Sequence, residues 1–202
     1  MWRYVWHIQR MELYTERMQQ AIRFMVKTHE VYQKQKRKGK DIPYISHPLT
    51  VGLILARAGA SEDVVIAGIL HDTIEDSVPE KPVTREMIEE RFGAEVARLV
   101  GSVTEAQKHV PWDERKQEAL AHIDTFDTDS VLLKSADIIA NNSETLEDYA
   151  IDGDATFERF SQSKEKTVGY ALSVIEALRA KWPESPLGRT LVLVAKKLSE
   201  IV

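Results

Sequence analysis

Apolar residues recur at helical spacing in almost every long segment of this 202-residue chain. Between residues 11 and 32, for example, Ala21, Phe24, Met25 and Tyr32 lie among charged side chains, as in an amphipathic helix. Only 9 glycines and 7 prolines interrupt such segments, and the alternating pattern of strands is not the prevailing one. We therefore predict an all-α fold.

No repeat, low-complexity tract or linker divides the sequence, so we expect one helical domain over residues 1–202. Within it, residues 1–18 form either an N-terminal extension or the first helix. The aromatic residues Trp2, Tyr4 and Trp6 of this segment either pack on the core or form an interface with another copy of the chain. Both interpretations, including a homo-oligomer, stay open at this point.

Composition excludes several classes of function. The chain has no cysteine, which excludes disulfide frameworks, thiolate metal sites and cysteine nucleophiles. Its net charge of −5 argues against nucleic acid as the main partner. No apolar run approaches the roughly 20 residues that a membrane span needs. We expect a soluble, cytoplasmic protein that does not act on membranes.

Residues 69–76, ILHDTIED, pass abruptly from an apolar run into ionisable side chains. If a helix continues through them, His71 lies one turn from Glu75, and Asp72 lies one turn from Asp76. Three carboxylates and an imidazole are costly near a core unless a positive group lies among them. A divalent metal ion is the simplest such group, and a solvated acidic helix end is the alternative.

A second histidine, His47, stands directly before Pro48, and proline fits the first turn of a helix, which would run to about Ala58. Another short helix follows, and two helices joined by a tight turn fold back on each other as a hairpin. The hairpin could bring His47 beside His71 and Asp72. Taken alone, His47 is equally a cap or a packing residue.

A further carboxylate, Asp137, lies in the apolar stretch 131–139. Unpaired burial would raise its pKa and destabilise the fold, so a cation partner is expected. Asn141 would lie on the same helix face, one turn later. The alternative is a buried aspartate that bonds to helix caps elsewhere.

Residues 33–42, QKQKRKGKDI, form a basic segment that interrupts the helical pattern. A solvated connection is one interpretation. The other is an anion-binding lip, in which Arg37 and Lys38 donate to phosphate oxygens.

Three stretches, RKGKDIPYISHP, AGILHDTIEDS and LLKSADIIANN, give the chain a family likeness. They resemble the hydrolase domain of RelA/SpoT-type enzymes and their small stand-alone relatives, which are HD-domain metal phosphohydrolases that remove pyrophosphate from the alarmone (p)ppGpp. The resemblance runs in order from about Ala21 to Tyr170. It implies a helical bundle in which short helices surround a metal site.

The resemblance also implies roles for individual residues. The ligands of a divalent metal, typically Mn²⁺ in this family, would be His47, His71, Asp72 and Asp137. The acidic pair that positions or deprotonates the attacking water would be Glu75 and Asp76. The residues that bind the nucleotide substrate would be Arg37, Lys38, Asn141, Lys164 and Tyr170.

The sequence departs from the family text in two places. The family reads ADKLHN or ADRLHN around the later aspartate, whereas this chain has Ile138 and Ala140 in place of the basic residue and the histidine. Extra residues also separate His29 from Arg37. We expect hydrolysis of (p)ppGpp without synthesis, and two alternatives remain: a phosphohydrolase for another nucleotide, and a sensor that binds a nucleotide without turning it over.

Overall fold

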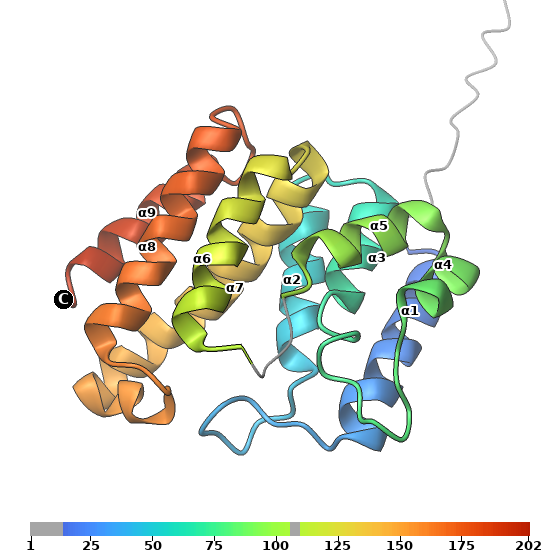
Figure 1. The fold of residues 1–202 in the computed structure, drawn as a ribbon, viewed down its shortest axis with the longest axis horizontal. Coiled ribbons are helices and arrows are strands. Elements are labelled where there is room, and N and C mark those ends of the chain that lie inside the picture. Colours follow the sequence, from blue (N-terminus) through green and yellow to red (C-terminus); the bar gives the residue numbers. More distant parts are fainter. Residues whose placement is uncertain (1–13, 106–109) are drawn as a thin grey trace, which may run out of the picture.

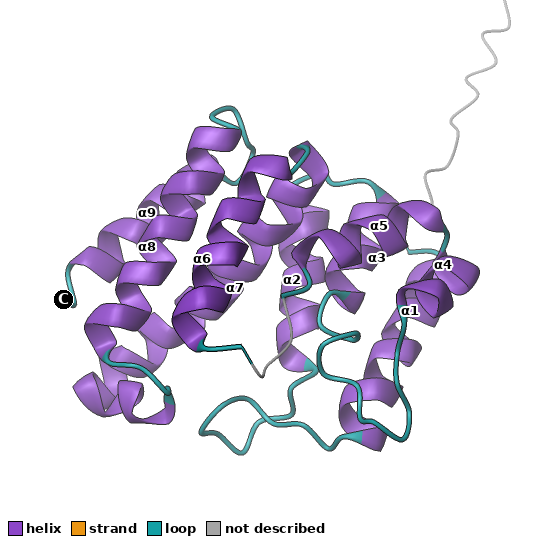
Figure 2. Ribbon diagram, viewed as in Figure 1, coloured by secondary structure: helices purple, strands orange, loops and turns teal. Residues whose placement is uncertain are grey.

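The computed structural model describes residues 14–105 and 110–202, and within these ranges it contains helices and loops but no strand (Figure 2). The all-α prediction is therefore confirmed. The aromatic residues Trp2, Tyr4 and Trp6 lie outside the described residues. None of the described helices combines the length and apolarity that crossing a bilayer requires.

The described α-helices follow one another along the chain and are labelled in Figure 1. They are α1 (Glu16–Val26), α2 (Ser46–Arg57), α3 (Glu62–Leu70), α4 (Arg85–Phe92), α5 (Ala94–Val103), α6 (Trp112–His122), α7 (Thr128–Asp152), α8 (Lys164–Lys181) and α9 (Gly188–Ser199). A π-helical turn, η1 (Lys27–Tyr32), extends α1, and short 3₁₀ turns follow α6 (η2, Ile123–Thr125) and α7 (η3, Gly153–Arg159).

Several helices begin where a short polar side chain can cap them. A cap side chain accepts a hydrogen bond from the backbone N–H three residues later, which satisfies one of the free donors of the first turn. Ser61 and Thr84 cap α3 and α4 in this way, as their positions in the sequence indicate. The other caps of this kind are Thr15, Asp127 and Ser163.

The hairpin of α2 and α3 is tightly packed because glycine stands at its contact points. A Cβ atom on Gly68 would lie 2.3 Å from Cδ1 of Leu55, and one on Gly52 would lie 2.8 Å from Cγ1 of Ile69. The connecting turn uses Gly59 at φ +77°, a left-handed conformation that glycine adopts without steric cost. The hairpin predicted from the sequence is therefore present, with a short distance between its two helices.

The long helix α7 connects the two sides of the molecule. It packs against α2, α3 and α5 on one side and against α8 and α9 on the other (Figure 1). Its first half is buried in the core, from Ser130 to Ala140 apart from Lys134, whereas its second half is partly exposed. A carboxylate on the buried half, such as Asp137, is therefore held among apolar side chains of several helices.

The ionisable stretch after α3 differs from the helical interpretation. Helix α3 ends at Leu70, and residues 71–76 form a run of turns. One bond of helical type remains, from the N–H of Asp76 to the carbonyl of Asp72 (3.0 Å). Glu75 and Asp76 bond to different partners far along the chain, the backbone of Glu105 and the side chain of Gln35.

Candidate active site and metal centre

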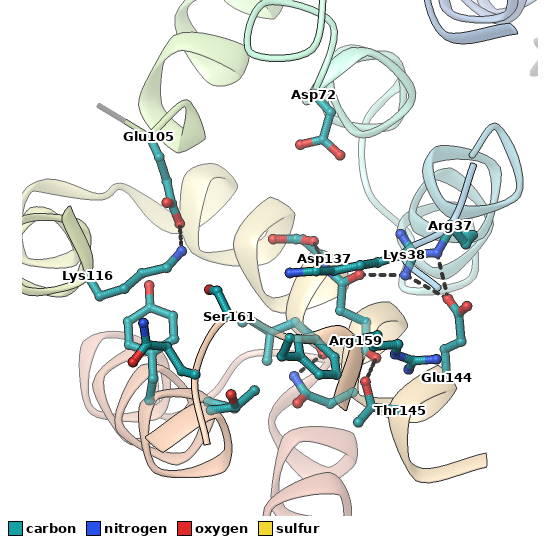
Figure 3. A pocket seen from close by; sticks show the side chains of 18 of the residues that line it. Arg37, Lys38, Asp72, Glu105, Lys116, Asp137, Glu144, Thr145, Arg159 and Ser161 are labelled. Carbon is teal, nitrogen blue, oxygen red and sulfur yellow. Dashed lines mark hydrogen bonds and ion pairs between the residues drawn. The ribbon is translucent and has the colours of Figure 1, made fainter. Parts of the chain in front are cut away.

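A cavity of 610 Å³ lies between the basic segment before α2, the turns after α3 and one face of α7. Figure 3 shows Glu105 and Lys116 on one side and Arg37 on the other, with Asp137 between them and Asp72 above. Residues from all three family-like sequence stretches, such as Arg37, Asp72 and Asp137, thus line one cavity.

Two histidines and two aspartates converge beside this cavity. His47 on α2 and His71 after α3 face each other, with 3.3 Å between their Nε2 atoms. Oδ2 of Asp72 lies 3.0 Å from Nε2 of His71, and Oδ1 of Asp137 lies 3.3 Å from Nε2 of His47. His47, His71 and Asp137 are buried. Helix α2 supplies His47, the turns directly after α3 supply His71 and Asp72, and α7 supplies Asp137.

The chemistry of this cluster fits a divalent metal ion. Ligand atoms of His47, His71 and Asp137 all lie within 4.8 Å of one another. Nδ1 of His71 lies 2.8 Å from the carbonyl oxygen of Gly68, so Nδ1–H donates there and Nε2 keeps its lone pair for a metal. Burial acts to lower the pKa of His71, but Asp72 and Asp137 raise it to about 9. The negative charge that holds this proton can hold a cation in its place.

Asp137 has two further partners, both on its own helix. The Lys134 ammonium lies 2.9 Å from Oδ2, and Nδ2 of Asn141 donates to Oδ1 at 2.6 Å. Burial opposes ionisation, but Lys134 and His47 hold the pKa of Asp137 well below its usual range. The predicted cation partner therefore includes a lysine that sequence reasoning missed, although its spacing three residues before Asp137 is typical of a helical ion pair.

Tyr44 is a second residue that the sequence did not single out. Its hydroxyl donates a hydrogen bond to Oδ2 of Asp72, and its ring contacts the rings of His29 and His47. Burial raises the pKa of Tyr44, and the charge of Asp72 raises it further, so the hydroxyl stays protonated. Tyr44 therefore holds one oxygen of Asp72 in place by donating to it.

Glu75 and Asp76 have separate environments. Glu75 lines the cavity, and its Oε1 accepts a hydrogen bond from the backbone N–H of Glu105 (2.5 Å). Burial raises the pKa of Glu75 to about 7, although the bond from Glu105 acts to lower it. Asp76 is not among the described residues that line the cavity; its Oδ2 accepts a hydrogen bond from Nε2 of Gln35 (2.8 Å).

The basic segment forms hydrogen bonds and ion pairs with α7, so it is not a solvated connection. Nε of Arg37 donates to Glu144 at 2.8 Å, and its Nη2 donates to Oδ1 of Asn141 at 2.8 Å. The ammonium of Lys40 lies 2.7 Å from Glu144 and 2.6 Å from Asp148. The segment forms a lip of the cavity, but the charge of Arg37 is already neutralised.

Lys38 differs from its neighbour Arg37. It lines the cavity, its ammonium lies 5.2 Å from the ring centroid of Phe160, and it forms no ion pair with any residue in the described ranges. Of the two predicted phosphate contacts, Lys38 is thus the one with donors still available.

The two residues predicted near the C-terminal side lie in different places. Tyr170 lines the cavity beside Trp112, and the ammonium of Lys116 lies 4.9 Å from its ring centroid. Lys164 is not among the described residues that line the cavity, and its ammonium pairs with Asp154 at 2.8 Å. The sequence did not identify Trp112 or Lys116, because they come from α6, which has no recognised motif.

The sequence is similar to several guanosine-3′,5′-bis(diphosphate) 3′-pyrophosphohydrolases. The relative from Aquifex aeolicus is 44% identical over 95 residues, which are 47% of this chain and 12% of that protein. The relative named MESH1 from Danio rerio is 37% identical over 115 residues, covering 55% of this chain and 61% of that protein. Human MESH1 is 34% identical over 124 residues, covering 60% of this chain and 65% of that protein. The match thus spans less than two thirds of each of these relatives.

Solved structures share the fold. A structure described as a metazoan ortholog of SpoT that hydrolyses ppGpp superposes with a TM-score of 0.69 at 22% identity, covering 93% of this chain and 94% of its own. A Listeria monocytogenes protein superposes with a TM-score of 0.68 at 31% identity, covering 77% of this chain and 97% of its own. The family model of the HD domain matches residues 21–141, which hold the whole histidine and aspartate cluster. The chain therefore belongs to the HD-domain family.

Proposed function

We propose that this chain is a metal-dependent phosphohydrolase that removes pyrophosphate from the ribose 3′ position of guanosine-3′,5′-bis(diphosphate), and that it does not synthesise this nucleotide. The observation that carries the proposal is the convergence of His47, His71, Asp72 and Asp137 beside a cavity that Glu75 also lines. The names of the relatives from Aquifex aeolicus, Danio rerio and human support the choice of substrate.

The cluster would hold one divalent ion through His47, His71, Asp72 and Asp137. Two imidazoles and two carboxylates, beside a cavity that water can enter, suit Mn²⁺ better than a closed structural zinc site. Such an ion supplies Lewis-acid chemistry, which lowers the pKa of water and offsets negative charge on phosphoryl oxygens. The choice of Mn²⁺ among divalent ions is part of the proposal.

Glu75 is the residue that takes the proton from the attacking water. Its pKa of about 7 is close to neutral pH, which is where a general base is most effective. Its Oε1 is engaged by the backbone of Glu105, which leaves Oε2 as the proton acceptor. Asp76, the other member of the predicted acidic pair, is not among the described residues that line the cavity, so it would support the reaction indirectly, through the side chain to which it bonds.

The reaction balances without a further reactant. The water oxygen forms a bond to the phosphorus attached to ribose O3′, and the bond between that phosphorus and O3′ breaks. O3′ takes up a proton, and the products are guanosine 5′-diphosphate and pyrophosphate. Lys38 would bind a phosphate group, and Tyr170 and Asn141 would contact the nucleoside. Lys116, which also lines the cavity, already pairs with Glu105 at 2.5 Å. Lys164 would contribute only at the outer rim.

The test is pyrophosphate release from ppGpp by the purified protein, with Mn²⁺ and with a chelator as control. We expect release only with the metal, and none from Glu75→Gln at unchanged fold. Wild type that leaves ppGpp intact in Mn²⁺ would contradict the proposal.

A different nucleotide substrate is the second candidate, and a specific observation favours it. Ile138 lines the cavity at the position where the family resemblance implies a basic residue, and Glu144 neutralises Arg37. A panel of nucleoside mono-, di- and triphosphates separates this candidate from the first. Nucleotide binding in Mn²⁺ without turnover of any panel member would instead indicate a sensor.

We also propose that residues 1–202 form one domain and that the protein is cytoplasmic. A single unfolding transition, seen at the same denaturant concentration by helical and aromatic signals, would support one domain. Gel filtration coupled to light scattering determines whether the chain forms a homo-oligomer.

A further inference from the structure

Gln35 lies on the cavity wall and connects two residues that do not line the cavity themselves. Its Nε2 donates to Oδ2 of Asp76 at 2.8 Å, and its Oε1 lies 2.7 Å from Nδ1 of His29. Gln35 lines the cavity, whereas Asp76 and His29 are not among the described residues that line it. Hydrogen bonds thus connect Asp76 and His29 with Gln35 at the cavity wall.

The orientation of the Gln35 carboxamide follows from the chemistry of its partners. A carboxylate can only accept hydrogen bonds, so the amide nitrogen has to face Asp76 and the amide oxygen has to face His29. His29 must then carry a proton on Nδ1, which it donates to that oxygen. Nε2 of His29 is buried without a hydrogen-bond partner in the described part of the chain, which agrees with a neutral ring in this tautomer.

The backbone holds Gln35 at the same place. Its N–H donates to the carbonyl of His29 (2.8 Å), and its carbonyl accepts from the N–H of Tyr44 (2.9 Å). The extra residues between His29 and Gln35 are accommodated by the π-helical turn η1 and by Lys34 at φ +52°. A π-helical turn accommodates an inserted residue without ending the helix, and such turns are frequent at functional sites. His29 therefore contacts Gln35 through both backbone and side chain.

We propose that Gln35 is a substrate-binding residue, that its second N–H donates to a phosphoryl oxygen of the bound nucleotide, and that Asp76 and His29 are positioning residues that act through it. An amide has two N–H groups, and Asp76 occupies one of them. A donor held from both sides costs little reorganisation when negative charge develops on the phosphoryl group. This inference rests on the proposed phosphohydrolase function.

The first test compares Gln35→Met with wild type. Methionine has a similar length and no amide, so the variant removes the donor and keeps the packing. Loss of a hydrogen bond to a charged group predicts a fall in kcat of roughly tenfold or more, because such bonds contribute about 1.5–3 kcal/mol. Gln33→Met is the matched control, since Gln33 lies two residues away and its Oε1 has no hydrogen-bond partner in the described ranges. We expect that control to stay within about twofold of wild type.

The second test asks whether Asp76 acts through Gln35. Asp76→Leu cannot accept from Gln35, whereas Asp76→Asn keeps an oxygen for it. We expect Asp76→Leu to match Gln35→Met in kcat within threefold, the double variant to lose nothing more, and Asp76→Asn to be at least threefold more active than Asp76→Leu. If Asp76 takes the proton of the water directly, Asp76→Asn will be as inactive as Asp76→Leu and the two losses will multiply, which overturns the inference.

A readout that does not need turnover keeps this inference separate from the proposed function. The side-chain NH₂ signals of Gln35 in a ¹⁵N-correlated NMR spectrum are identified by their loss in Gln35→Met. In the wild-type protein with its metal, we expect slow exchange of these protons with water and a clear shift of both signals in Asp76→Leu. A protein that shows this coupling but leaves ppGpp intact contradicts the proposed function only. A protein that hydrolyses ppGpp with unchanged Gln35 signals in Asp76→Leu contradicts the inference only.

Discussion

Replacing Glu75 with glutamine should abolish hydrolysis and at the same time stabilise the metal-free protein. In the folded chain the pKa of Glu75 is raised to about 7 from an ordinary value of 4.5, chiefly by burial. At about 1.4 kcal/mol per pH unit, this corresponds to a destabilisation of about 3 kcal/mol above pH 7. Glutamine keeps the oxygen that accepts from the backbone N–H of Glu105 and carries no charge to bury.

The direction of the pH dependence follows from proton binding. Between pH 4.5 and pH 7 the folded state holds the Glu75 proton more tightly than the unfolded state, so the contribution of Glu75 to the stability of the wild type falls as pH rises through this window. Glutamine does not titrate. The difference in unfolding free energy between Glu75→Gln and wild type should therefore be small near pH 4.5 and reach about 3 kcal/mol in favour of the variant by pH 8.

Urea unfolding of both proteins in EDTA, at pH 4.5, 6 and 8, measures this difference. Chelator is required because a bound cation near Glu75 would favour the carboxylate. Glu90→Gln, on the exposed side of α4, is the matched control and should leave the free energy nearly unchanged at each pH. A Glu75→Gln difference that does not change with pH, or a wild type that is the more stable at pH 8, would refute the reasoning.

Four further results are expected. Adding Mn²⁺ at 100 times its Kd should stabilise the folded protein by about 2.7 kcal/mol and raise Tm, with reversal by EDTA, and an unchanged Tm would show that no ion binds. Asp137→Ala should abolish that shift and also cost about 3–5 kcal/mol in the metal-free protein, because it leaves the Lys134 ammonium buried without its carboxylate; a denaturation midpoint close to wild type would contradict this. Gly68→Ala should destabilise by about 1–3 kcal/mol in urea unfolding, because the new Cβ would overlap Leu55, whereas full stability would show that the α2–α3 contact can relax. Lys38→Met should raise KM for the nucleotide with little change in kcat, and an unchanged KM would remove Lys38 from the substrate contacts.

Much of the fold was predictable because helix formation depends on neighbours in the sequence. The caps Ser61 and Thr84, the proline at the start of α2 and the turn at Gly59 all act within a few residues. The stretch after Leu70 was less predictable. The spacing of the ionisable residues in 71–76 is compatible with a helix and also with the observed turns. The packing of other segments around this stretch selects between the two.

The side chains that could form a metal centre were predictable from local sequence patterns and family resemblance. His47, His71, Asp72 and Asp137 were identified from residue type, from spacing and from family resemblance, and each is costly to bury alone. Their meeting point is determined by the short α2–α3 hairpin, which local signals already indicate. That part of the site therefore needed little knowledge of the tertiary structure.

The pairing of the groups around the cluster depends on contacts between distant segments, which the sequence does not reveal. Arg37 and Lys38 are adjacent in the sequence, but Glu144, on α7, neutralises the first and not the second. Glu75 faces the cavity, whereas Asp76 bonds to Gln35, on a segment that precedes it by 41 residues. Local spacing determines which side chains share a helix face, whereas the partner of a charged group depends on which distant segment packs against it, and no short-range pattern carries that information.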